Sequence, residues 1–94
     1  MKVSWSRRAQ RDPRRIKSYI GKRNPDAASD VSSRINGAAD RLEQFPLSGP
    51  EVEGTALRLL QVPGLTYALA YRVGLNAIEI LSVFDQRRNP EEKN

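Results

Sequence analysis

The side chains that most often carry chemistry in proteins are missing from this sequence. Its 94 residues include no histidine and no cysteine. Zinc sites and Ser-His or Cys-His catalysis are therefore excluded, because they depend on these residues as ligands, nucleophiles or bases. No disulfide can form, and we expect neither a metal nor a cofactor.

Carboxylates and aromatic rings are the next candidates. Glu79 is the only carboxylate inside the predicted strands, and its period-two neighbours Leu81 and Val83 are apolar. We interpret Glu79 as an exposed carboxylate at a sheet edge. Four aromatic residues could stack on nucleic-acid bases, but strand aromatics in so small a domain are expected mainly in the core. They are Trp5, Tyr67, Tyr71 and Phe84.

The positive charge is concentrated near the N-terminus. The net charge is +5, yet residues 1–23 hold nine basic residues and one acidic residue, whereas residues 24–55 hold two basic and six acidic residues. Such an uneven field steers encounters with an anionic partner, either a polyanion or an acidic protein surface. A solvated helix face that keeps the protein soluble accounts for the charge equally well.

Length and composition predict one folded domain over residues 1–94, with a frayed tail at residues 90–94. Hydrophobic residues make up 38% and charged residues 29%, as in soluble globular domains. The longest apolar run, residues 57–62, contains Arg58 and Gln61, so we expect no membrane span, no signal peptide and a cytoplasmic location.

The first half of the chain predicts a short strand and two helices. Residues 2–5 alternate as a strand, and Ser6 can cap a helix over residues 7–23. Pro13 leaves two interpretations open, a single kinked helix or a first turn ending at Asp12, which then caps a second helix. Asn24 and Pro25 start the next helix, of about 20 residues, joined to the first as an antiparallel hairpin. Its predicted core seam is Ala28, Val31, Ile35, Ala38, Leu42 and Phe45.

The second half predicts three antiparallel strands, over residues 56–62, 65–73 and 77–84, because the connections between them are short. In the last strand Ile78 and Ile80 fall on one face, and Leu81 and Val83 on the other. That strand is therefore expected to be central or covered on both faces. The fold class is α+β, a two-layer β-α-α-β-β-β domain in which a helical hairpin packs on a small, mainly antiparallel sheet.

Seven short motifs carry a resemblance to a known family. As a set, and in this order, they resemble the ParE branch of the RelE/ParE superfamily of bacterial toxin–antitoxin modules, and they span nearly the whole chain. They are VSWSRRAQRD (3–12), IKSYI (16–20), NPDAA (24–28), LEQFP (42–46), VPG (62–64), YALAYRV (67–73) and IEILSV (78–83).

The resemblance implies a RelE/ParE-like fold and a toxin held inactive in a hetero-oligomer with a ParD-like antitoxin, whose partly disordered tail folds along the toxin surface. ParE-like members act on DNA gyrase and stall it on cleaved DNA, whereas RelE-like members cut messenger RNA in the ribosome. We expect no membrane partner and only indirect contact with nucleic acid. The chain departs from the family at Pro13, where the helix usually continues with leucine, and at Asp85 and Gln86, where relatives commonly carry histidine and a small residue.

RelE-like members are known for an arginine directly after a tyrosine in the middle strand, a second arginine after the last strand and a C-terminal tyrosine. Here Ala68 follows Tyr67, and no aromatic residue follows Phe84. We therefore favour a non-enzymatic toxin that inhibits DNA gyrase by protein contact. The alternatives are a ribosome-dependent mRNA endoribonuclease and a non-toxic basic nucleic-acid-binding module.

Two overlapping sets of arginines are the predicted binding residues. Arg58 and Arg72 are expected on the small-residue faces of their strands, where an open surface could receive a partner, although pairing across the sheet is an equal alternative. The set predicted to bind the target is Arg58, Arg72, Arg87 and Arg88. The set predicted to bind the antitoxin is Arg11, Arg14, Arg15 and Arg58.

Overall fold

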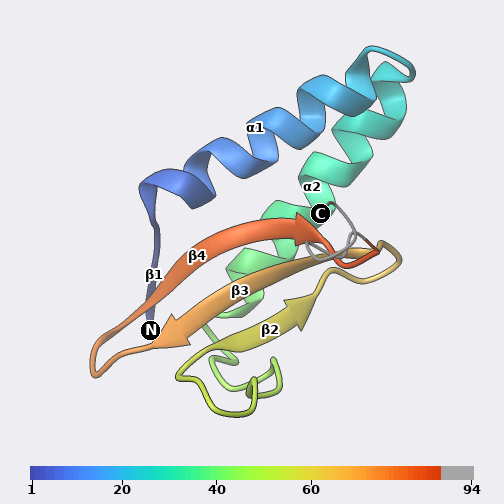
Figure 1. Cartoon of the computed structure of the whole chain (residues 1–94). Coiled ribbons are helices and arrows are strands. Elements are labelled where there is room, and N and C mark those ends of the chain that lie inside the picture. The colour runs from blue at the N-terminus through green and yellow to red at the C-terminus, as the bar shows by residue number, and fades with distance from the viewer. Residues whose placement is uncertain (88–94) are drawn as a thin grey trace.

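A computed structural model describes residues 1–87 of the chain (Figure 1). Its elements follow the predicted α+β order, and no helix among these residues is long and apolar enough to cross a membrane. The tail predicted to fray, residues 90–94, lies outside the described residues. In chain order the elements are β1 (Lys2–Trp5), α1 (Arg7–Gly21), α2 (Pro25–Arg41), β2 (Arg58–Gln61), β3 (Tyr67–Val73) and β4 (Ala77–Asp85).

The four strands form one mixed sheet in the order β1-β4-β3-β2. β1 runs parallel to β4, and the other two pairs are antiparallel. The two helices pack against each other, and in Figure 1 α1 passes above β4 while α2 descends behind the strands. The prediction of a helical hairpin on a mainly antiparallel sheet is confirmed.

α1 is a single helix that contains Pro13, so the interpretation of this segment as two helices was wrong. Ser6 caps it as predicted, since its Oγ accepts a hydrogen bond from the Ala9 amide at 3.1 Å. Pro13 has no N–H, so the Ala9 carbonyl loses its usual partner within the helix. Asp12 does not cap a second helix. Its carboxylate is instead buried against β4.

α2 begins as predicted, because the Asn24 Oδ1 accepts a hydrogen bond from the Ala27 amide at 3.1 Å and Pro25 is the first helical residue. The helix ends at Arg41, and the chain continues in a turn. Leu42 is still fully buried, but Phe45 is 60% exposed. The prediction that Phe45 belongs to the core was wrong, because the helical period no longer applies beyond the end of the helix.

A bulge in β4 changes which side chains share a face. Ala70 pairs with Ser82 and Tyr71 pairs with Ile80, so Leu81 is an extra residue on the β4 side. A bulge shifts the alternation of side chains by one residue. Ile80 and Val83 are consequently both part of the buried core, and the prediction that they face opposite ways was wrong. The prediction of a central strand holds, since β4 lies between β1 and β3.

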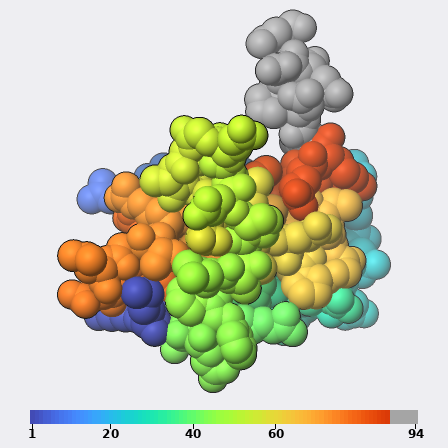
Figure 2. Space-filling view, turned by 90° about the horizontal axis from the view of Figure 1, so that it is seen from below, coloured from blue at the N-terminus to red at the C-terminus, as the bar shows by residue number. Residues whose placement is uncertain are grey.

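The core joins both helices to one face of the sheet, and Tyr71 is its largest fully buried side chain. The Tyr71 hydroxyl accepts a hydrogen bond from the Gly49 amide and donates one to the Pro46 carbonyl, both at 2.9 Å. These bonds fix the loop between α2 and β2. Figure 2, seen from below, shows the green and yellow-green residues of this loop over the middle of the molecule.

Candidate functional site

A groove of about 660 Å³ runs between α1 and the second half of β4, and we call it the edge groove. Its wall on α1 is formed by Arg8, Asp12, Arg15, Ile16 and Tyr19. Its wall on the sheet is formed by Tyr67, Val83, Phe84, Asp85 and Arg87.

The groove exists because the chain leaves the sheet after β1. β1 pairs with β4 only as far as Trp5 opposite Ile80, and the chain then turns into α1. Ser6 makes the junction, since its amide donates to the Ile80 carbonyl at 2.9 Å and its hydroxyl donates to the Leu81 carbonyl at 3.1 Å. On this side of β4, residues 81–85 therefore face α1 instead of another strand, whereas β3 pairs with them on the other side.

Asp12 lies at the floor of the groove and links α1 to β4. Its side chain is 7% exposed, and its Oδ2 accepts a hydrogen bond from the Val83 amide at 2.9 Å. Its Oδ1 accepts a hydrogen bond from Arg15 at 2.9 Å. The carboxylate thus supplies the acceptor that a neighbouring strand would otherwise give to Val83, and both of its oxygens are engaged.

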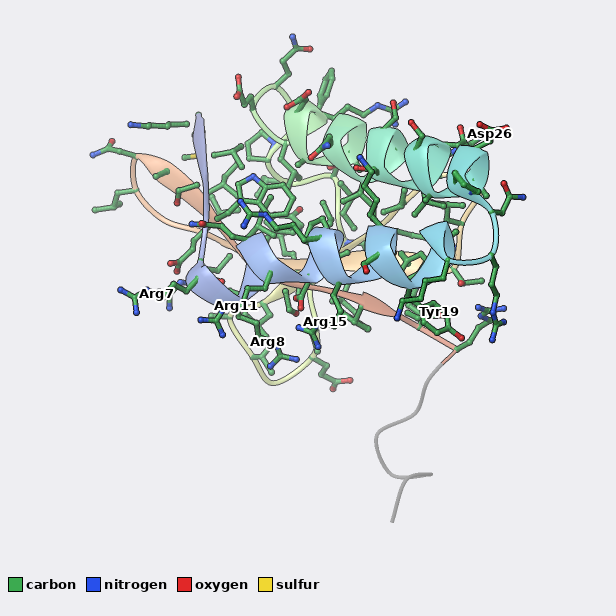
Figure 3. All side chains as sticks on the ribbon, turned by 90° about the horizontal axis from the view of Figure 1, so that it is seen from above. Arg7, Arg8, Arg11, Arg15, Tyr19 and Asp26 are labelled. Carbon is green, nitrogen blue, oxygen red and sulfur yellow. The ribbon has the colours of Figure 1, made fainter. Side chains whose placement is uncertain are left out.

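Arginines form the rim. Figure 3 shows Arg7, Arg8, Arg11, Arg15 and Tyr19 along the flank of α1 that is turned away from α2. Tyr19 is 51% exposed, and the Arg23 guanidinium lies 5.4 Å from the centre of its ring, within cation–π range. Ile16 and Tyr19 add apolar surface between these cations, so the α1 wall is amphipathic.

Arg87 stands on the opposite rim and is held by Asp85. The Asp85 carboxylate accepts hydrogen bonds from the Arg87 amide at 3.0 Å, from its Nε at 3.2 Å and from its Nη2 at 2.9 Å. These bonds, with a smaller contribution from Thr66, lower the pKa of Asp85 to about 2. Asp85 is therefore a weak base at neutral pH.

Of the predicted binding residues that the structure describes, Arg15 and Arg87 line the edge groove, and Arg11 lies on the same flank of α1. Arg14 is elsewhere, in a second hollow beside Trp5 and Pro13. Arg88 lies outside the described residues.

The predicted position of Arg58 was wrong. It pairs with Tyr71 across the strands and therefore shares the large-residue face. Its Nη1 donates to the Gly49 carbonyl at 2.8 Å, and its Nη2 contacts Glu51 at 3.1 Å, so its side chain holds the loop.

Arg72 pairs across the sheet with Glu79, with Nη2 and Oε1 2.7 Å apart. This is the alternative that the sequence left open. Glu79 lies on the central strand β4, so its interpretation as an edge carboxylate was wrong. The tyrosine–arginine order typical of nuclease-type members does occur in β3, at Tyr71 and Arg72. Tyr71 is nevertheless fully buried, and its hydroxyl is engaged with the loop.

Arg8, Asp12 and Tyr19 were not predicted to belong to one site. Arg8, Arg15 and Tyr19 are seven and four residues apart, which places them on one helix face. That spacing was visible. The wall that β4 contributes could not be predicted in this way, because it depends on how far β1 pairs with β4 before the chain enters α1.

Comparisons with known proteins identify the family. The family model described as the ParE toxin of the type II toxin–antitoxin system parDE matches residues 3–90. The chain belongs to the ParE toxin family.

Two named toxins are similar to this ParE family chain. It is 37% identical over 82 residues to a protein of Sinorhizobium fredii that is named as the toxin Y4kP. The match covers 87% of this chain and 84% of Y4kP. It is 33% identical over 81 residues to Toxin RelE2 of Caulobacter vibrioides, covering 86% and 90%.

The fold is shared with a solved structure, the chromosomal ParDE system from P. aeruginosa. The TM-score is 0.82 at 23% identity, over 90% of this chain and 95% of the solved one. The predicted RelE/ParE-like fold is thereby confirmed, and the chain is a type II toxin of this family.

Proposed function

We propose that this ParE family toxin inhibits DNA gyrase by protein contact and is neutralised by a ParD-like antitoxin that binds the edge groove. The observation that carries the proposal is the family match across residues 3–90. It covers every element that forms the groove, so the toxin scaffold is present as a whole.

The chemistry of the groove supports binding rather than catalysis. Cleavage of RNA needs a group that takes a proton from the 2′-hydroxyl at neutral pH. The two carboxylates of the groove are poorly suited, because both oxygens of Asp12 are hydrogen-bonded and the pKa of Asp85 is lowered to about 2. The chain has no histidine to take their place.

The same groove has the composition of a protein-binding surface. Protein interfaces are enriched in aromatic residues and arginine around an apolar centre. Here Tyr19 and Phe84 accompany Ile16, with Arg8 and Arg87 at the rim. An antitoxin segment that is acidic and amphipathic would complement this surface, at the cost of several kcal/mol for ordering a disordered tail.

A ribosome-dependent endoribonuclease is the second candidate, and the similarity to Toxin RelE2 favours it. The two activities are separated by inducing the toxin in a bacterium with and without the neighbouring antitoxin gene. Growth, plasmid supercoiling and messenger RNA half-life are measured in the same cultures.

We expect growth arrest and relaxed plasmid with stable messenger RNA, and rescue by the antitoxin. Arrest with rapid loss of messenger RNA and normal supercoiling would contradict the gyrase target and support the nuclease. Uninhibited growth without antitoxin would contradict toxin activity altogether.

A further inference from the structure

The outward side of α1 carries basic residues that lie between two hollows. Arg8 and Arg15 line the edge groove on one side, and Arg14 and Lys17 line the second hollow, beside α2, on the other. We define the outer face of α1 as the exposed basic residues of this helix and its C-cap that do not line the edge groove. They are Arg7, Arg11, Arg14, Lys17 and Lys22. Figure 3 shows the first two of them pointing away from α2.

The charges of the outer face are not neutralised by other parts of the protein. Asp12 is the only acidic residue in the first 23 residues, and its carboxylate is buried against β4. Within residues 1–87, no cation of the outer face forms an ion pair with a carboxylate. The residues that α2 contributes to the second hollow, Ser32 and Asn36, are uncharged. The outer face therefore attracts an anionic partner by its uncompensated field.

The outer face lacks the apolar centre of a protein interface. Such interfaces are enriched in aromatic residues around an apolar core. Ile16 and Tyr19 line the edge groove instead, and the exposed side chains between the cations of the outer face are polar, Gln10 and Ser18. Trp5 lines the second hollow, but it packs against the core. Stacking on single-stranded bases would need exposed aromatic rings, which this face does not offer.

The composition and the length of the outer face fit the backbone of a nucleic-acid double helix. Phosphates of a duplex are bound by arginine and lysine together with serine, asparagine and glutamine, as found here around the second hollow. α1 has 15 residues and is therefore about 22 Å long, the span of about six phosphates of one DNA strand. Arg7, Arg11 and Arg14 are four and three residues apart, so they lie on one side of the helix.

We propose that the outer face of α1 binds the phosphate backbone of double-stranded DNA without reading its sequence. The contact is direct and separate from the edge groove, whereas the family resemblance implied only indirect contact with nucleic acid. The choice of DNA among double-helical polyanions rests on the proposed function, because gyrase acts on double-stranded DNA. An RNA duplex and an acidic protein surface are the occupants that the test must separate from it.

The test uses the full-length toxin, a labelled DNA duplex of about 20 base pairs, which is longer than α1, and fluorescence anisotropy at several salt concentrations. Two double variants lose the same charge from different surfaces. Arg11→Gln with Arg14→Gln changes the outer face. Lys2→Gln with Arg41→Gln changes exposed residues of β1 and of the last turn of α2. Circular dichroism confirms that both variants are folded.

We expect the affinity of the wild type for the duplex to fall steeply with salt, because phosphate contacts release counterions. The outer-face variant should bind at least about tenfold more weakly at low salt, and its slope of log affinity against log salt should be shallower by about two, since two phosphate contacts are lost. The control variant should stay within about twofold of the wild type. Equal weakening by the two variants would overturn the proposal, because net charge alone would then account for binding.

Competition separates the other occupants. The unlabelled DNA duplex should displace the label at least as well as an RNA duplex of the same sequence, and far better than a polyglutamate peptide of equal charge. Stronger displacement by the RNA duplex would overturn DNA as the occupant, and equal displacement by polyglutamate would overturn it in favour of an acidic protein surface. A toxin that inhibits gyrase but binds no duplex would overturn this inference alone. A toxin that binds the duplex as expected but does not inhibit gyrase would support it and contradict the proposed function.

Discussion

Asp12 connects α1 to β4 through a single carboxylate. The Val83 amide that donates to this carboxylate is buried, and within residues 1–87 no strand pairs with β4 there to offer another acceptor. We expect Asp12→Ala to lower the free energy of unfolding by about 1–3 kcal/mol, because a buried donor is left without a partner. Asp12→Asn keeps an acceptor oxygen and should lose less. Urea unfolding of both variants measures the difference, and an equal loss for the two would contradict this role.

Two glycines allow a matched comparison of close packing with helix propensity. A Cβ at Gly49 would lie 2.6 Å from the Leu59 carbonyl oxygen, whereas a Cβ at Gly37 meets nothing within 4 Å. Gly49→Ala should therefore destabilise the fold by about 1–3 kcal/mol, and Gly37→Ala should stabilise it by about 0.5–1 kcal/mol. Thermal unfolding checks both signs. A neutral Gly49→Ala would show that the loop between α2 and β2 is not held as tightly as its bonds to Tyr71 imply.

The lowered pKa of Asp85 predicts how the stability of the fold changes at acid pH. Its hydrogen bonds from Arg87 lower its pKa from 3.8 to about 2, so the ionised form stabilises the folded state. The contribution is fully present above about pH 4 and is lost as the pH falls to about 2. Between these values the stability of the wild type should fall more steeply than that of Asp85→Asn, which cannot ionise. Urea unfolding across this range measures both profiles, and parallel profiles would contradict the assignment.

At the scale of the elements, α1 carries the cations of the groove despite a proline in its interior. Proline inside a helix costs about 3 kcal/mol through the missing hydrogen bond and steric conflict with the preceding turn. Pro13→Ala should therefore raise the melting temperature, with a gain of up to about 3 kcal/mol in unfolding free energy. A lower melting temperature would indicate that packing of the proline ring beside Trp5 outweighs that cost.

The helix starts were predictable because their signals are local. Ser6 and Asn24 each accept a hydrogen bond from the amide three residues later, so a few neighbouring residues decide the cap. The bulge at Leu81 was not predictable in this way. The Ser6 hydroxyl donates to the Leu81 carbonyl from 75 residues away in the sequence, and the Asp12 carboxylate accepts from the nearby Val83 amide from 71 residues away.

The same distinction applies to the candidate site. The α1 wall follows from helical spacing, and a count of residue types already shows its positive charge. The β4 wall requires the parallel pairing of the first and last strands, which places residues 2–5 beside residues 77–80. For this reason Arg15 and Arg87 were assigned to separate predicted sets although they line one groove.

At the scale of the whole molecule, one face of α1 and one edge of the sheet form a surface with arginines at its rim and apolar side chains on both walls. The chain belongs to the ParE toxin family, and both named toxins that it resembles cover more than four fifths of its length. In the function that we propose, the antitoxin binds this surface and the toxin acts by contact with gyrase.

The most direct test of the proposed function is DNA supercoiling by purified gyrase in the presence of the purified toxin. Supercoiling should fall as toxin is added, with accumulation of cleaved DNA, and addition of the antitoxin beforehand should prevent both effects. If gyrase retained full activity in excess toxin, while the same preparation arrested translation by cutting ribosome-bound messenger RNA, the central claim would be contradicted.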